Sequence, residues 1–287
     1  MPSFPDGRPT MDIAARLTLN DGVAIPCFGL GLYQMGGGKR TEDAVRWALE
    51  AGYRHFDTAA LYRNEAELGA ALRRAIADGL VARDDVFVTT KLWNDDHGHD
   101  RALRAFDASM ERLGLDVVDL YLIHWPVERR RLDSWRALEA IRKGGRARSI
   151  GVSNYTVRHL SELLDAGGSP PSVNQIELHP FHQRRDIVAF CRKHQIAVEA
   201  YSPLTKGHKL DDRRLVALAK AAGKSPAQLL IRWSLQKGFV CIPKSADKTR
   251  LAQNAAVFEF ALTDAQMAAL DALDAREAIT WDPTDAP

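Results

Sequence analysis

Asp57, Lys91 and His124 each close a short run of mostly apolar residues. Lys91 follows Asp57 by 34 residues and His124 follows Lys91 by 33, close to the roughly 30 residues of one βα unit. Strands repeated at this spacing end at the same edge of a parallel sheet, where barrel enzymes keep their active sites. Tyr62 lies just past Asp57, on the loop that follows, and can reach the same edge.

The four side chains suit proton transfer. A phenol has a pKa of about 10, too high for balanced proton exchange at neutral pH. An adjacent ammonium group favours the phenolate and lowers that pKa, and a carboxylate beside the ammonium holds it in place. We therefore expect Asp57, Lys91 and Tyr62 to form a proton relay, with His124 holding a carbonyl oxygen. Any one of them alone would be a surface charge or a packed histidine, whereas four at coordinated positions favour a site.

The elements that must position these residues alternate along the chain. From about residue 40, helical stretches with i, i+3, i+4 apolar spacing alternate with nearly unbroken apolar runs. Unbroken apolar strands are typical of a parallel sheet covered by helices. Eight such units favour a closed (β/α)8 TIM barrel over an open doubly wound α/β sheet. We predict the strands near residues 54–58, 86–91, 117–124, 147–152, 172–177, 197–202, 239–243 and 256–260.

A β-hairpin is predicted before the first unit. Asn20-Asp21-Gly22 separates the apolar runs Leu17-Thr18-Leu19 and Val23-Ala24-Ile25, and Asp-Gly between such runs is a hairpin signal. No linker or low-complexity segment divides the chain. We therefore predict a loose N-terminal extension at residues 1–15 and a single barrel domain at residues 16–287.

The composition argues against several other classes of protein. Lys and Arg total 39 against 37 for Asp and Glu, which gives no global basic field for nucleic acid or an anionic membrane. No membrane-spanning apolar run and no signal peptide occurs, so we expect a cytoplasmic protein. Cys27, Cys191 and Cys241 fit no disulfide or metal pattern, and the pair His97 and His99 has no third ligand cluster, so no metal is expected.

The motifs around the four residues resemble the catalytic segments of the aldo-keto reductases, and the resemblance extends along nearly the whole chain. It is carried by His55-Phe56-Asp57-Thr58-Ala59 followed by Tyr62, by Thr90-Lys91-Leu92-Trp93, and by Ile123-His124-Trp125-Pro126. It implies that Tyr62 is the general acid, that Lys91 and Asp57 tune it, and that His124 orients the carbonyl. It is closest to bacterial members that reduce keto-sugar acids and simple aldehydes.

The same resemblance implies a substrate pocket with aromatic walls. The positions that match its lining are Tyr33, Trp93, His124 and Trp125. We expect Trp281, in the C-terminal tail, to reach the mouth of this pocket. Aromatic walls with one His and one Tyr suit a small carbonyl compound.

A nicotinamide cofactor is implied at the later strand ends. No G-x-G-x-x-G opens a helix, and Gly36-Gly37-Gly38-Lys39 lacks the rest of a P-loop, so neither motif is supported. The resemblance instead implies a platform made by Ser153, Asn154, Gln175, Tyr201, Ser202 and Leu204. Its amide and hydroxyl groups can grip a carboxamide, and Tyr201 can stack on the ring.

A second segment resembles the family's site for the adenosine 2′-phosphate, which favours NADPH over NADH. It comprises Lys244, Ser245, Arg250 and Asn254, and the resemblance implies that Gln253 beside them touches the adenine. Two cations and a hydroxyl at the start of a short helix form a local anion site. Gln253 stands where many members carry Glu. The short segment 204–210 carries Lys206, His208 and Lys209, which either replace part of a belt across the pyrophosphate or form an ordinary basic loop.

We therefore predict a monomer that reduces aldehydes or ketones with NADPH. Two alternatives stay open. One is a cofactor-holding regulatory subunit of the same fold. The other is a barrel aldolase or isomerase that uses Lys91 as a Schiff-base amine, although Asp57 and Tyr62 beside Lys91 argue against it.

Overall fold

The computed structural model describes residues 11–283. Eight parallel strands form one sheet, in the order β10-β9-β8-β7-β6-β5-β4-β3. Phe28 bridges to Cys241 in parallel, and the amide of Cys241 donates to the carbonyl of Cys27 at 2.9 Å, so the sheet closes on itself. The predicted TIM barrel is confirmed. Its strands are β3 (Leu30–Gly31), β4 (His55–Asp57), β5 (Phe87–Leu92), β6 (Val118–Ile123), β7 (Ala147–Ser153), β8 (Val173–Glu177), β9 (Ala197–Tyr201) and β10 (Val240–Cys241).

The strand predicted at residues 256–260 is wrong. Ala256–Glu259 form a 3-10 turn, η5, directly after a helix. The missing strand is β3, near the N-terminus. It is only two residues long, too short to show periodicity, and it needs close backbone approach: a Cβ on Gly31 would lie 2.9 Å from the carbonyl oxygen of Ile242.

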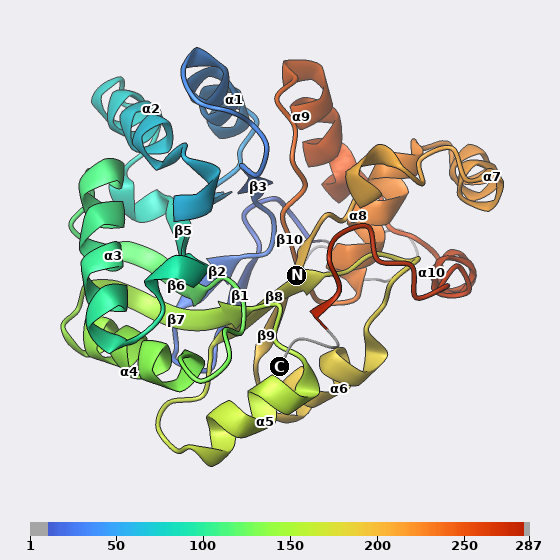
Figure 1. Cartoon of the computed structure of the whole chain (residues 1–287). Coiled ribbons are helices and arrows are strands. Elements are labelled where there is room, and N and C mark those ends of the chain that lie inside the picture. The colour runs from blue at the N-terminus through green and yellow to red at the C-terminus, as the bar shows by residue number, and fades with distance from the viewer. Residues whose placement is uncertain (1–10, 284–287) are drawn as a thin grey trace.

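Helices surround the sheet (Figure 1). Each presents an apolar stripe to the strands. In α3 the buried apolar residues are Ala102, Phe106, Met110 and Leu113, which recur at three- and four-residue steps and so share one face. The helices are α1 (Lys39–Glu50), α2 (Glu65–Ala77), α3 (His99–Leu113), α4 (Arg131–Lys143), α5 (Val157–Asp165), α6 (Arg185–Lys193), α7 (Arg213–Ala222), α8 (Pro226–Gln236), α9 (Lys248–Ala255) and α10 (Asp264–Asp271).

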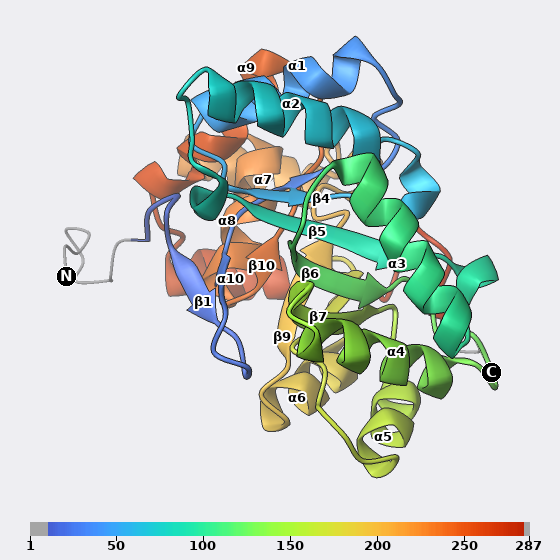
Figure 2. The ribbon, with the colours of Figure 1, turned by 90° about the vertical axis from the view of Figure 1, so that its left-hand side faces the viewer.

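The predicted N-terminal hairpin is confirmed as β1 (Arg16–Thr18) and β2 (Ala24–Pro26). At its tip, Oδ2 of Asp21 accepts hydrogen bonds from the hydroxyls of Ser149 and Ser172, both at 2.7 Å. These serines lie near the start of β7 and just before β8, so the hairpin covers the amino end of the barrel (Figure 2). The carboxyl end of the strands is left for the site.

The predicted N-terminal extension is described only in part. Its first ten residues lie outside the described range. Beyond them, Met11 and Ile13 pack against the hydrophobic core, and the carbonyl of Ala15 accepts from the amide of Cys27 at 2.9 Å. Residues 11–15 are therefore attached to the barrel.

Candidate active site

A cavity of about 1300 Å³ opens at the carboxyl ends of the strands. The residues predicted to bind cofactor or substrate line it together, although they come from strand ends spread over the whole chain. Those lining it are Tyr33, Trp93, His124, Trp125, Ser153, Asn154, Gln175, Tyr201, Ser202, Leu204, Lys244, Ser245, Arg250, Gln253 and Asn254. Asp57 and Tyr62 also line it, whereas Lys91 is fully buried behind them.

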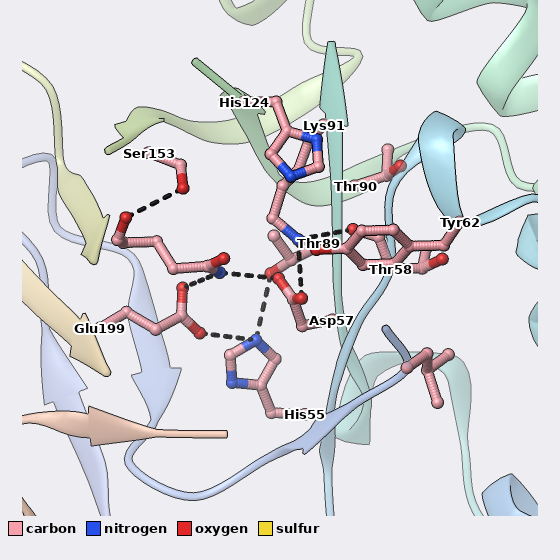
Figure 3. Close-up of polar contacts among 12 residues, drawn as sticks. His55, Asp57, Thr58, Tyr62, Thr89, Thr90, Lys91, His124, Ser153 and Glu199 are labelled. Carbon is pink, nitrogen blue, oxygen red and sulfur yellow. Dashed lines mark hydrogen bonds and ion pairs between the residues drawn. The ribbon is translucent and has the colours of Figure 1, made fainter. Parts of the chain in front are cut away.

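Lys91 holds the centre of the site (Figure 3). Its Nζ donates to Oδ1 of Asp57 at 2.6 Å and to the carbonyl of Thr58 at 2.8 Å. It also lies 3.3 Å from the hydroxyl of Tyr62, which the short 3-10 turn η1 (Ala60–Tyr62) carries back over the end of β4. The three groups of the predicted relay are therefore in contact.

The phenol of Tyr62 keeps its proton at neutral pH. Burial raises the pKa of Tyr62 well above its usual value, and the charge of Asp57 raises it further. The expectation that Lys91 would lower this pKa is not met, because burial is the larger effect. A protonated phenol in this position can donate a proton, and a neighbouring ammonium group can stabilise the phenolate that is left.

His124 faces Tyr62 across the cavity floor. Its ring meets that of Tyr62 at 5.6 Å and that of Trp93 at 5.2 Å, both edge to face. Burial, followed by the charge of Lys91, lowers the pKa of His124 well below its usual value. The neutral imidazole can offer one N–H to a substrate oxygen without carrying a charge.

The residues of the predicted nicotinamide platform are hydrogen-bonded to one another and to His124. Nδ2 of Asn154 donates to the carbonyl of His124 and to the hydroxyl of Ser153, each at 3.0 Å. The hydroxyl of Tyr201 donates to Oδ1 of Asn154 at 2.8 Å. Asn154 and Ser202 have φ values of 64° and 49°, in the left-handed region that non-glycine residues seldom adopt. Backbone strain held in this way is common at binding sites.

Cations gather at the other end of the cavity. Lys244 and Ser245 follow β10, and Arg250 lies in the first turn of α9. Oδ1 of Asp247 accepts from the amide of Arg250 at 2.8 Å, so this carboxylate caps the helix and the cationic side chains remain for an anion. Arg40 of α1 lines the same cavity, and after burial its charge is the next cause that lowers the pKa of Lys244. Arg40 was not predicted from the sequence, because only the fold brings α1 to this end of the cavity.

Glu177, also missed, holds the C-terminal tail over the mouth. The amide of Ile279 donates to its Oε1 at 2.6 Å, and the amide and hydroxyl of Thr280 both donate to Oε2. Trp281 then packs on Trp125 with ring centroids 4.8 Å apart, so the expected place of Trp281 at the mouth is found. Glu177 could have been predicted from its position, because it is the last residue of β8.

Of the three basic side chains in the loop after β9 (Lys206, His208 and Lys209), one lines the cavity. Among the described residues of this loop, Lys206 lines it and lies over the ring of Tyr33 at 5.3 Å. Lys209 instead forms an ion pair with Glu277 in the tail. The loop therefore divides its cations between the cavity and the tail.

Neither a membrane span nor a metal cluster is found in residues 11–283. No helix there is both long and apolar enough to cross a membrane. No group of three or more His, Cys, Asp or Glu side chains in that range is arranged to hold a metal ion.

Comparison with known proteins agrees with the resemblance seen in the motifs. A model of the Aldo/keto reductase family matches residues 28–275. Glyoxal reductase of Bacillus subtilis (strain 168) is 43% identical over 267 residues, covering 93% of this chain and 95% of the relative. Methylglyoxal reductase DkgA of Yersinia pestis is 43% identical over 277 residues, covering 95% and 98%. A Bombyx mori aldo-keto reductase solved in complex with NADP is 39% identical, with a TM-score of 0.88 and coverage of 95% and 97%. This chain belongs to the aldo-keto reductase family.

Proposed function

We propose that the protein reduces small aldehydes and ketones to alcohols with NADPH, and that Tyr62 supplies the proton. The observation that carries this proposal is the array of Asp57, Lys91 and Tyr62 facing His124 at the floor of the cavity. Relatives named glyoxal reductase and methylglyoxal reductase support a small carbonyl substrate.

The residues present fit an NADPH molecule. Ser153, Asn154 and Gln175 would hold the carboxamide, and Tyr201 offers a ring face to the nicotinamide. At the far end, Lys244 and Arg250 would bind the adenosine phosphate, where charge-assisted hydrogen bonds are strongest. When bound, NADPH supplies the hydride that reduces the carbonyl carbon.

The side chains at the floor manage the charge on the substrate oxygen. The hydroxyl of Tyr62 and a ring N–H of His124 both donate to it, so negative charge that develops there meets two fixed donors. Tyr62 then gives up its proton, and the ammonium of Lys91 at 3.3 Å stabilises the phenolate that remains. Asp57 accepts a hydrogen bond from Nζ of Lys91 and so holds it in place.

The aldolase or isomerase alternative is not favoured. A Schiff base needs a neutral amine that can reach the substrate. Lys91 is fully buried, makes an ion pair with Asp57 and does not line the cavity.

A panel of small aldehydes and ketones, assayed for oxidation of NADPH by the purified protein, tests the proposal. Turnover with at least part of the panel is expected, with dicarbonyls such as methylglyoxal included. NADPH binding without turnover on any member would favour the regulatory-subunit alternative instead.

A further inference from the structure

A second carboxyl group lies inside the barrel beneath the proposed relay. Glu199 is in the middle of β9 and fully buried. Gln175 of β8 is its direct partner in the parallel register, so both side chains point to the barrel interior. Figure 3 shows Glu199 and His55 on the side of Asp57 away from His124. Neither the proposed mechanism nor the motifs give Glu199 a role.

The amide of Gln175 bridges two carboxyl groups. Its Nε2 donates to Oδ2 of Asp57 and to Oε2 of Glu199, both at 2.8 Å. A side-chain amide has two N–H donors, so these bonds use both of them. Among the described residues none donates to Oε1 of Gln175, and Gln175 lines the cavity. The amide is therefore held with its nitrogen toward the carboxyls and its oxygen available as an acceptor.

The surroundings of Glu199 favour its neutral, protonated form. Burial, followed by the charge of Asp57, raises the pKa of Glu199 to about 8, although Gln175 and Lys91 oppose the rise. Its Oε1 faces Nε2 of His55 at 3.5 Å, and burial lowers the pKa of His55 to about 3, so that imidazole is neutral. Gly29 leaves room for the ring, because a Cβ there would lie 2.8 Å from it. A neutral Glu199 can thus accept from Gln175 without adding a second buried negative charge.

We propose that Glu199 is a positioning residue: by accepting the second N–H of Gln175, it fixes the Gln175 amide with its oxygen toward the nicotinamide carboxamide. The carboxamide nitrogen is a donor, so it needs an acceptor at this point of the platform. Without Glu199, the Gln175 amide would keep only the bond to Asp57 and could turn. This inference rests on the proposed NADPH site.

Ionisation of Glu199 has a second consequence, for the relay. The groups that face it are Gln175 on β8, Cys241 on β10, His55 and Asp57 on β4, and Lys91 on β5. Asp57 and Glu199 both raise the pKa of Tyr62. When Glu199 loses its proton, at a pH of about 8, Tyr62 becomes a weaker acid and carbonyl reduction slows.

Two variants of the full-length protein separate positioning from packing. In Glu199→Gln the amide oxygen still accepts from Gln175, and the new side chain does not ionise. We expect its dissociation constant for NADPH at neutral pH to stay within about twofold of wild type. Its kcat/KM should lose the inflection at a pH of about 8. In Glu199→Leu an N–H of Gln175 is left unpaired, and NADPH binding should weaken by about tenfold or more.

Trp fluorescence titration gives the dissociation constants, and rates from about pH 6 to about pH 10 give the profile. Glu65→Gln is the matched control, because Glu65 is buried but bonds to Thr90 and Arg112 outside the cavity. It should keep the inflection. The inference is overturned if Glu199→Leu binds NADPH as wild type does, or if Glu199→Gln keeps the inflection. An inflection that persists in Glu199→Gln would overturn the inference even if Glu199→Leu does not fold. A wild-type protein that neither binds NADPH nor reduces carbonyls would refute the proposed function itself.

Discussion

Lys91 is central to the proposed chemistry, because its Nζ contacts both the carboxylate of Asp57 and the hydroxyl of Tyr62. We expect Lys91→Met to slow carbonyl reduction by about 10²-fold, since the phenolate of Tyr62 loses its cation. The change also leaves Asp57 as a buried, unpaired charge, so unfolding free energy should fall by about 3–5 kcal/mol. Steady-state rates and urea unfolding measure the two effects. A variant with normal turnover would show that the relay is wrong.

Arg250 tests the preference for NADPH. Arg250→Ala should weaken NADPH binding by about tenfold, because a charge-assisted hydrogen bond to the phosphate is lost, and should hardly change NADH binding. The matched control is Lys248→Ala, two residues away on α9, where the lysine pairs with Glu50 and does not line the cavity. Fluorescence titration of both cofactors gives the comparison. Equal losses for NADPH and NADH would mean that Arg250 is structural.

The chain's repeats pointed to residues that the structure brings together, whereas residues placed by packing alone were not predicted. Asp57, Lys91 and His124 stood out because each ends a strand one unit after the last. Glu199 did not, because a charged residue inside an apolar run gives no sign of what it faces across a barrel. The direction of the Tyr62 pKa was also wrong, since the degree of burial is a property of the folded cavity.

At the scale of an element, the C-terminal tail is held by the carboxylate of Glu177, the last residue of β8. Burial would raise the pKa of Glu177, but hydrogen bonds from His179, Thr280 and Ile279 outweigh it and lower the pKa to about 2. The tail contacts therefore persist at neutral pH. They should be lost as the pH falls from about 4.5, the ordinary value, toward about 2.

Glu177→Gln should loosen the tail and raise KM for the carbonyl substrate several-fold with a smaller change in kcat, because Trp281 would leave the pocket wall. Trp281→Ala should have a similar effect. If Glu177 affects KM only by holding Trp281 in place, the double variant should have the same KM as either single variant. If the two increases in KM instead multiply in the double variant, Glu177 and Trp281 act independently and the link between them is contradicted.

Element prediction was limited by strand length. Long apolar runs such as those of β5 and β6 were found with bounds close to the observed ones. The two residues of β3 were missed, and the run near Phe258 was mistaken for a strand. The ring of Phe258 instead lies 5.5 Å from that of Phe28 and packs against the hydrophobic core.

At the scale of the whole molecule, ionisable groups buried inside the barrel lower the free energy of unfolding. Glu199 keeps its proton up to a pH of about 8 in the folded protein, whereas the unfolded chain loses it above about 4.5. The native state therefore binds more protons than the unfolded state between these values, and stability falls as pH rises across that window.

Glu199→Gln removes this dependence. Near neutral pH it should be more stable than wild type by on the order of 3 kcal/mol, and the difference should shrink toward pH 5. Urea unfolding at several pH values measures it. A difference that stays constant with pH would show that Glu199 is ionised in the folded barrel.

The central claim is that Tyr62 donates the proton in NADPH-dependent carbonyl reduction, and Tyr62→Phe tests it most directly. The measurement is the single-turnover rate of NADPH oxidation with an excess of methylglyoxal, alongside the dissociation constant for NADPH. The structure predicts an unchanged dissociation constant, because the ring stays, and a rate lower by about 10²-fold or more, because the hydroxyl is gone. A wild-type rate in the purified Tyr62→Phe protein would contradict the account.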